Sequence, residues 1–274
     1  MINSLRRFHN LDKKDLTVSR FVNALVRRIV GLRYMLEYNM PFGFSKRNKE
    51  RLKSFKDIHK GKRCFIIANG PSLKKVDLSL LKNEITIGMN RIYLMKEVNG
   101  FVPNYLACID KKSQIEQFYD ELDKLDVPCF FNYDMHGYFS KKDNQYFIKE
   151  KFSPDFSKDI VGDPCGNGKT VTYTCMQIAY YMGFAEVYLI GKDHSYNTGE
   201  KAGKRIESDG EEKNHFIKGY YRPGQKWDAP DYKSEEFAYR LARDVFEQEG
   251  RIIRDATVGG KLNVFEKVDF AELF

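Results

Sequence analysis

The sequence has few cysteines, and none of them are closely paired. Five cysteines are scattered over 274 residues, an odd number with no Cys-x-x-Cys motif; they are Cys64, Cys108, Cys129, Cys165 and Cys175. A disulfide framework or a structural zinc site needs paired, closely spaced cysteines. We therefore expect reduced thiols in or near the core of a cytoplasmic protein.

Long apolar runs are missing as well. No run approaches the roughly 20 residues that span a bilayer. Arg6 and Arg7 lead into polar sequence rather than into the apolar core of a secretory signal. We expect neither a membrane span nor an export signal.

Two nucleotide-related motifs are also absent. There is no Asp-x-Asp motif of the kind that metal-dependent sugar transferases use. Gly168-Lys169-Thr170 resembles the end of a P-loop, but the first glycine of that motif would fall at Asp163. We expect no obligatory metal and no P-loop.

The positive charge is concentrated at the start of the chain. The net charge is +8, yet residues 1–63 hold 17 Lys and Arg against five Asp and Glu, so the rest is slightly acidic. Apolar residues between Val18 and Leu32 recur at helical spacing with arginines between them, which predicts a basic helical extension over residues 1–60. Such a helix contacts the inner face of an anionic membrane, or it packs on its own domain or on a second subunit of a homo-oligomer. The basic residues are not interleaved with stacking aromatics, so we expect no nucleic-acid partner.

The remainder, residues 61–274, alternates between strand and helix patterns. Short apolar runs predict strands at 64–68, 84–90, 105–110, 127–132, 186–191 and 251–254. Helical patterns lie between them, the clearest at 171–182 and 232–248. This order predicts an α/β domain with a Rossmann-like, mostly parallel sheet flanked by helices. The irregular stretches 133–168 and 196–230 are expected to form lid-like loops.

Polar residues follow several of these strands. The first strand runs into Asn69-Gly70-Pro71-Ser72, and later ones into Asn90, Asp110 and Asp193-His194. The carboxyl ends of parallel strands share one edge of the sheet, where open α/β sheets bind ligands. The helix that starts after Lys169 adds an amino-terminal dipole suited to phosphate, with Thr170 or Thr172 as its cap.

These segments resemble a known family. Ile-Ile-Ala-Asn-Gly-Pro-Ser-Leu, Gly-Met-Asn90, Gly-Phe-Ala-Glu-Val-Tyr-Leu-Ile-Gly-Lys-Asp-His-Ser and Ala-Thr-Val-Gly-Gly-Lys resemble the 6-hydroxymethylpterin pyrophosphokinase-like domain family over roughly residues 55–272. More distantly, the chain is similar to the bacterial sialyltransferases of glycosyltransferase family 42. Those enzymes share the Asn-Gly-Pro-Ser turn and a buried strand that ends in Gly-x-Asp.

The resemblance implies a nucleotide-sugar transferase whose donor lies on the polar strand ends. The expected donor- and nucleotide-binding residues are Asn69, Gly70, Pro71, Ser72, Asn90, Asp110, Thr170 and Thr172. The sialyltransferases have Asn at the position of Asp110. Their catalytic histidine follows a His-Tyr pair, whereas His215-Phe216 matches that pair here and no second histidine follows.

The chemistry that we expect first is transfer of a sugar from a nucleotide-activated donor, with CMP as one option, to a cell-surface glycan or a lipid-linked acceptor. His215 is the preferred base, because an imidazole titrates near neutrality. His194 is the second choice, and Asp193 completes the catalytic set. Lys169, Tyr220 and Tyr221 are expected to assist the departing phosphate.

The family label supports a different reaction, ATP-dependent transfer of diphosphate to a pterin alcohol or a similar small molecule. That reaction needs Mg²⁺, for which Asp110 and Asp193 are the available carboxylates. The large hydrophilic loops and the basic extension favour a glycan acceptor. A non-catalytic nucleotide-binding role is a further alternative.

Overall fold

The computed structural model describes residues 18–196, 200–211 and 213–274, with side chains from residue 29 onward. The chain divides into two compact units, Met1–Lys46 and Arg47–Phe274. The described part of the first unit is dominated by helix α2 (Val18–Asn39), and helix α3 (Gly43–Lys53) follows it. The start of the predicted basic extension, residues 1–17, lies outside the described residues.

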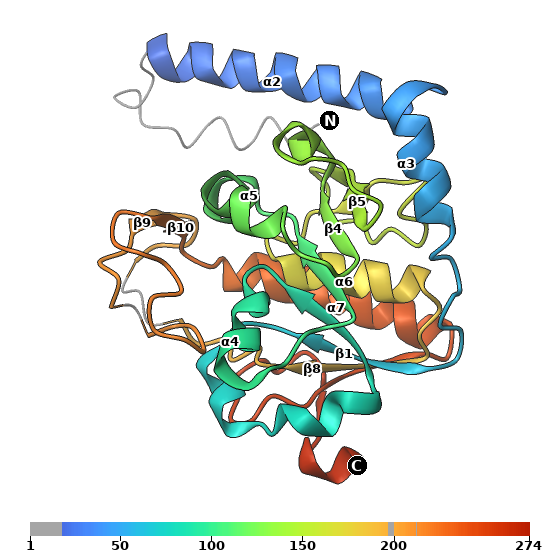
Figure 1. Ribbon diagram of the computed structural model, residues 1–274, viewed down its shortest axis with the longest axis vertical. Coiled ribbons are helices and arrows are strands. Elements are labelled where there is room, and N and C mark those ends of the chain that lie inside the picture. Colours follow the sequence, from blue (N-terminus) through green and yellow to red (C-terminus); the bar gives the residue numbers. More distant parts are fainter. Residues whose placement is uncertain (1–17, 197–199, 212) are drawn as a thin grey trace. The chain divides into compact units, whose positions relative to one another are not determined.

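The second unit is built on a central sheet of eight strands, in the order β12-β11-β8-β1-β2-β3-β4-β5. The strands are β1 (Arg63–Ile67), β2 (Ile85–Met89), β3 (Tyr105–Cys108), β4 (Cys129–Asn132), β5 (Gln145–Ile148), β8 (Glu186–Ile190), β11 (Ile252–Asp255) and β12 (Glu266–Lys267). All of their pairings are parallel. The predicted α/β, Rossmann-like fold class is confirmed (Figure 1).

Helices cover this sheet. They are α4 (Met95–Asn99), α5 (Glu116–Leu122), α6 (Val171–Tyr181) and α7 (Tyr232–Gln248), and Figure 1 shows α6 and α7 lying together. Almost every residue of α6 is buried, because it packs on the sheet and also against α7. Shorter helical pieces are η3 (Pro71–Lys75), η4 (Leu78–Asn83), η5 (Ile92–Leu94), η6 (Lys111–Ile115), η7 (Tyr133–Tyr138) and η8 (Ala271–Leu273).

The central strands form where the sequence is apolar on both faces. In β1 and β8 only the first residue is partly exposed, as expected for central strands with helices on either side. The five cysteines are free and buried. Burial raises the pKa of the Cys175 thiol, which favours the unreactive protonated form.

The segment 133–168 is not the irregular loop that we expected throughout. Gln145–Ile148 forms the edge strand β5, and β6 (Glu150–Lys151) pairs with β7 (Cys165–Gly166). Asn48 covers this edge, because its side chain bonds to the backbone N–H and C=O of Phe147 at 2.9 and 2.7 Å. The second expected loop, 196–230, contains the antiparallel hairpin β9 (Arg205–Glu207) and β10 (Lys226–Asp228).

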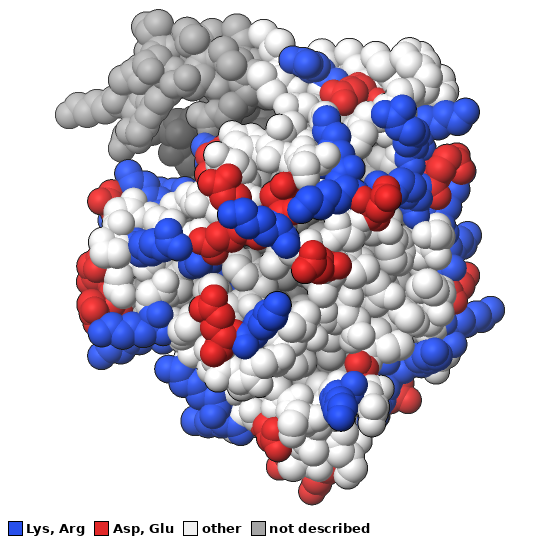
Figure 2. Space-filling view, viewed as in Figure 1, with Lys and Arg blue, Asp and Glu red and all other residues white. Residues whose placement is uncertain are grey.

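Basic and acidic side chains are interspersed on the face that Figure 2 shows. No helix in the described part of the chain has the length and apolar character needed to cross a membrane.

Candidate functional site

The sheet reverses its direction of growth at β1. From β1 the chain adds β2, β3, β4 and β5 on one side, and β8, β11 and β12 on the other. Open parallel sheets bind their ligands at such a switch point, outside the carboxyl ends of the strands. The Asn-Gly-Pro-Ser turn after β1 and the Lys192–His194 segment after β8 therefore flank the candidate site.

Asp193 holds the Asn-Gly-Pro-Ser turn in place. Its carboxylate accepts the Ser72 hydroxyl at 2.6 Å and the Ser72 backbone N–H at 3.1 Å. The approach is so close that a Cβ added to Gly70 would lie 1.8 Å from the Asp193 carboxylate and 2.5 Å from the Gly191 carbonyl. Position 70 thus requires glycine because a larger side chain would clash with the residues that follow β8. Its backbone angles do not require glycine.

Two asparagines bring buried, unsatisfied oxygens to this edge. Asn69 donates from Nδ2 to the Met89 carbonyl at 3.0 Å, which ties the end of β1 to the end of β2. The Oδ1 atoms of Asn69 and Asn90 are buried and accept no hydrogen bond from the described residues. Asn90 also has a φ of 50°. Unsatisfied acceptors and left-handed backbone are both costly, and in native proteins they concentrate at functional sites.

The start of helix α6 faces the same strand ends. Thr170 is its N-cap and accepts the Thr172 backbone N–H at 3.3 Å. The Thr172 hydroxyl lies 3.5 Å from the Met89 sulfur, so the first turn of α6 reaches the end of β2. Lys169 precedes the cap with a φ of 62° and an exposed side chain. The helix dipole thus points its positive end toward the asparagines.

The segment that carries His215 lies against the carboxyl end of β1. The Phe216 N–H donates to the Asn69 carbonyl at 2.9 Å. The His215 ring is 7% exposed and stacks on Tyr220, with ring centroids 3.8 Å apart. The structure thus brings His215 and Asn69 close together, although 146 positions separate them in the sequence.

The two tyrosines expected to assist a departing phosphate are buried in the fold. The Tyr220 hydroxyl accepts the Arg91 backbone N–H at 3.2 Å, and the Tyr221 hydroxyl accepts from the Gln114 amide. Arg91 is buried, with its guanidinium paired to Glu121 at 2.9 Å and 3.9 Å above the Phe118 ring. Sequence reasoning missed Arg91, which anchors the His215 segment to β2.

His194 occupies a separate, mixed-charge position after β8. The buried Lys192 ammonium pairs with Glu235 at 2.8 Å. Burial opposes the lysine charge, but the Glu235 carboxylate outweighs it and raises the Lys192 pKa. His194 has a φ of 54°, and its Nε2 lies 3.1 Å from Glu236. Burial and the nearby Lys192 charge lower the pKa of His194, so its neutral form is favoured at pH 7.

Asp110 stands at a second charged cluster, at the ends of β3, β4 and β5. Its carboxylate accepts the backbone N–H groups of Lys112 and Ser113 at 3.1 and 2.9 Å, capping η6. Its side chain is open to water on one side, yet the surrounding protein desolvates it and raises its pKa. Glu150, which sequence reasoning did not single out, accepts a 2.8 Å bond from Asn132, and its pKa is raised by desolvation to about 8.

Asp134 completes this cluster by binding both neighbouring lysines, Lys111 at 2.5 Å and Lys149. The described residues contain no group of three or more His, Cys, Asp or Glu side chains arranged to hold a metal ion.

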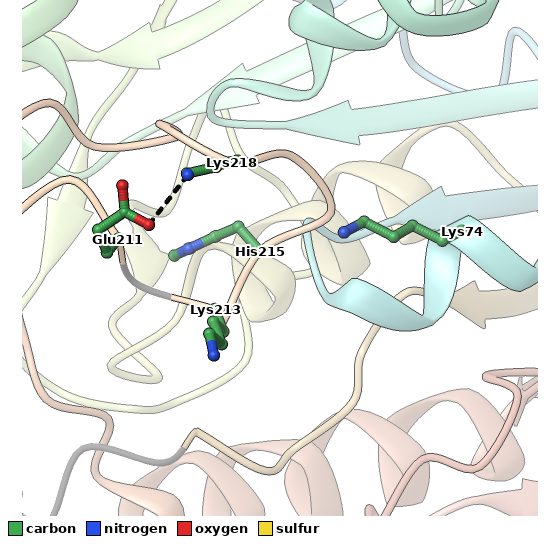
Figure 3. Close-up of a pocket in the computed structure, with 5 residues that line it drawn as sticks. All are labelled: Lys74, Glu211, Lys213, His215 and Lys218. Carbon is green, nitrogen blue, oxygen red and sulfur yellow. Dashed lines mark ion pairs between the residues drawn. The ribbon is translucent and has the colours of Figure 1, made fainter.

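A pocket of about 370 Å³ opens next to His215. Its lining residues are Lys74, Glu211, Lys213, His215 and Lys218, drawn in Figure 3. Lys74 comes from η3, directly after the Asn-Gly-Pro-Ser turn, and the other four come from the His215 segment. Sequence reasoning did not select these lysines, because lysine is frequent throughout the chain.

Comparison with solved structures gives a match to the MAf glycosyltransferase from Magnetospirillum magneticum AMB-1. The match has a TM-score of 0.49 and 14% identity, and it covers 84% of this chain. The chain spans only 39% of that protein. No curated protein matches.

The model of the 6-hydroxymethylpterin diphosphokinase MptE-like family matches residues 38–199. This segment contains β1 and its turn, β2, the start of α6, β8 and Asp193. The match covers more than half of the chain and agrees with the resemblance expected from the sequence. The protein belongs to the 6-hydroxymethylpterin diphosphokinase MptE-like family.

Proposed function

We propose that the protein is a transferase that binds a nucleotide-activated sugar at the carboxyl ends of β1, β2 and β8 and passes the sugar to a hydroxyl acceptor. The observation that carries the proposal is the pair of buried, unsatisfied oxygens on Asn69 and Asn90. A nucleoside offers the missing donors, because ribose hydroxyls and the amino groups of bases both donate hydrogen bonds. The helix start at Thr170 supplies partial positive charge for the phosphate beside it.

His215 is the base in this proposal. It takes the proton from the acceptor hydroxyl, and the hydroxyl oxygen then bonds to the anomeric carbon of the sugar. The bond between that carbon and the donor phosphate breaks, and its electron pair goes to the phosphate. Positioning and electrostatic stabilisation of the leaving group are the main contributions that such a site makes.

Two contacts favour glycosyl transfer over metal-assisted diphosphate transfer. Both carboxylate oxygens of Asp193 accept hydrogen bonds from Ser72, and one oxygen of Asp110 caps η6. Both oxygens of Asp193 are thus engaged within the fold, and one of the two oxygens of Asp110 is engaged as well. Diphosphate transfer from ATP to a pterin alcohol is nevertheless the second candidate, because the family description names that activity.

The test is a thermal-stabilisation panel of CMP, UDP, GDP and ATP, each with and without Mg²⁺. A nucleotide that carries sugars, such as CMP, is expected to raise the melting temperature without Mg²⁺, and Asn69→Ala should abolish the effect. Stabilisation by ATP alone, and only with Mg²⁺, would favour the diphosphokinase and overturn the glycosyltransferase.

The role of His215 needs a variant that keeps its packing. In His215→Phe the ring can still stack on Tyr220, but no base remains. We expect wild-type nucleotide binding and at least a 100-fold loss of turnover, the scale of a lost general base. Full turnover in His215→Phe would assign the base to another group, with His194 the next candidate.

We also propose a glycan or lipid-linked acceptor at the inner membrane face. Within the first unit, Ile29, Leu32 and Leu36 of α2 are exposed near Arg33, a composition suited to a lipid surface. Wild-type protein should sediment with phosphatidylglycerol vesicles more than with phosphatidylcholine vesicles, and Leu32→Glu/Leu36→Glu should not. Equal sedimentation of the variant would remove the membrane from the proposal.

A further inference from the structure

The described residues that line the pocket beside His215 carry more positive than negative charge. Of the four ionised side chains in its lining, three are lysines and one is Glu211. Glu211 pairs with Lys218 at 3.0 Å, and both side chains are well exposed. Lys74 and Lys213 have no carboxylate partner among the described residues. Like charges gathered in one hollow repel one another, and an anion bound between them relieves this repulsion.

The pocket adjoins the turn at the end of β1. Lys74 is two residues beyond Ser72, whose N–H and hydroxyl are fixed by Asp193. The opposite wall of the pocket belongs to the segment that carries His215. The hydrogen bond from the Phe216 N–H to the Asn69 carbonyl keeps this segment next to the turn. In Figure 3 the Lys74 ammonium extends toward His215 from one side, and Lys218 and Lys213 lie to either side of the imidazole.

We propose that Lys74, Lys213 and Lys218 form the subsite for the phosphate of the nucleotide substrate, the group on which negative charge accumulates during transfer. This inference rests on the proposed function, since it places the nucleoside at Asn69 and Asn90. It replaces Tyr220 and Tyr221 in the leaving-group role, because both side chains are buried within the fold. Lysine ammonium groups are well suited to a phosphate that changes charge during the reaction.

A binding measurement tests the subsite without turnover. Inorganic pyrophosphate is titrated calorimetrically into the full chain at low ionic strength. We expect saturable binding to the wild type, and about three- to tenfold weaker binding to each of Lys74→Ala, Lys213→Ala and Lys218→Ala. Pyrophosphate that does not bind to the wild type would overturn the proposal.

Glu211→Gln provides the opposite change. Removing this carboxylate frees Lys218 and deletes the one negative charge among the described lining residues, so pyrophosphate should bind about two- to fivefold more tightly. Damage to the fold cannot produce tighter binding, so this variant separates a charge effect from a structural one. Unchanged or weaker binding in Glu211→Gln contradicts the subsite.

The matched controls are Lys82→Ala, Lys96→Ala and Lys124→Ala. These exposed lysines precede β2, β3 and β4 and therefore lie toward the opposite, amino-terminal edge of the sheet. They change the net charge by the same amount and should leave pyrophosphate affinity unchanged. If they weaken binding as much as the pocket variants do, the attraction is to net charge alone and the subsite is rejected.

The source of the phosphate is resolved by competition. CMP should displace pyrophosphate from the wild type, and cytidine should not. The lysine variants should weaken CMP and leave cytidine unaffected. If glycerol 3-phosphate displaces pyrophosphate while no nucleotide does, the pocket holds the phosphate of an acceptor, and its assignment to the nucleotide fails. The proposed function has a separate test. It fails if no nucleotide raises the melting temperature, or if Asn69→Ala keeps the effect.

Discussion

The Ser72 hydroxyl donates to the Asp193 carboxylate at 2.6 Å, across 121 positions of sequence. From the sequence, Asp193 was expected to act in catalysis. This contact gives it a structural role as well, because it holds the turn after β1. The Ser72 backbone N–H donates to the same group. The turn after β1 is therefore held in place by hydrogen bonds within the protein and needs no bound ligand to fix it.

The first prediction concerns this pair. Ser72→Ala should lower the free energy of unfolding by about 1–2 kcal/mol, because it removes a charge-assisted hydrogen bond. Asp193→Asn should cost a similar amount, and the double variant should cost less than the sum of the two. Chemical denaturation of the four proteins measures the coupling. Strict additivity would show that the two side chains do not act as a unit.

The second prediction separates binding from folding at Asn90. Asn90→Gly removes the unsatisfied oxygen and places the residue type best suited to a φ of 50°. We expect the free energy of unfolding to change by less than about 1 kcal/mol and nucleotide stabilisation to be lost. Lys141→Gly is the control, since Lys141 also has a positive φ of 60° but is exposed and precedes β5, toward the amino-terminal edge of the sheet. Retained nucleotide stabilisation in Asn90→Gly would exclude the Asn90 side chain from the donor site.

The third prediction concerns the buried ion pair of Lys192 and Glu235. Glu235→Gln leaves the Lys192 ammonium buried without its anion and should cost about 3–5 kcal/mol. The double change Lys192→Met/Glu235→Leu removes both charges and should recover most of this loss. Thermal or urea unfolding checks both variants. A Glu235→Gln protein as stable as the wild type would mean that water reaches the pair.

The fourth prediction is a pH dependence set by Glu150. Its pKa is raised from 4.5 to about 8 in the folded protein, so the folded state holds the proton more tightly than the unfolded chain does. The stabilisation from this group is complete below pH 4.5 and is lost as the pH rises from 4.5 toward 8.

Glu150→Gln keeps an acceptor for Asn132 and cannot ionise. Between pH 5 and pH 9 it should lose about 1–2 kcal/mol less of its free energy of unfolding than the wild type. The exposed Glu116→Gln serves as the control and should follow the wild type. Parallel pH curves for the wild type and Glu150→Gln would show that Glu150 stays ionised in the folded protein.

Much of the fold could be predicted because the buried strands are apolar on both faces and are separated by helical patterns. The predicted strand at 186–191 and helix at 232–248 differ from β8 and α7 by no more than one residue at any end. Strand β5 was missed because Gln145–Ile148 is only four residues long and lies among charged residues. Its place at the sheet edge depends on pairing with β4 and on the side chain of Asn48, which is distant in sequence.

The site was predictable in outline and not in detail. Polar strand ends located Asn69, Asn90 and Asp193, because parallel topology alone brings such ends together. The unsatisfied oxygens, the positive φ of Asn90 and the packed hydroxyl of Tyr220 depend on atomic contacts that no spacing encodes. Lys74 and Lys213 form one pocket only because the segment after residue 208 folds back onto the turn after β1.

The position of β1 also determines when the candidate site can form during synthesis. Its pairing with β2 joins segments about 20 residues apart, whereas its pairing with β8 joins segments more than 100 residues apart. Contacts of such long sequence separation form late. A nascent chain that ends before Asp193 lacks the carboxylate that fixes Ser72. We therefore expect the proposed nucleotide site to form only when β8 and Asp193 dock onto β1.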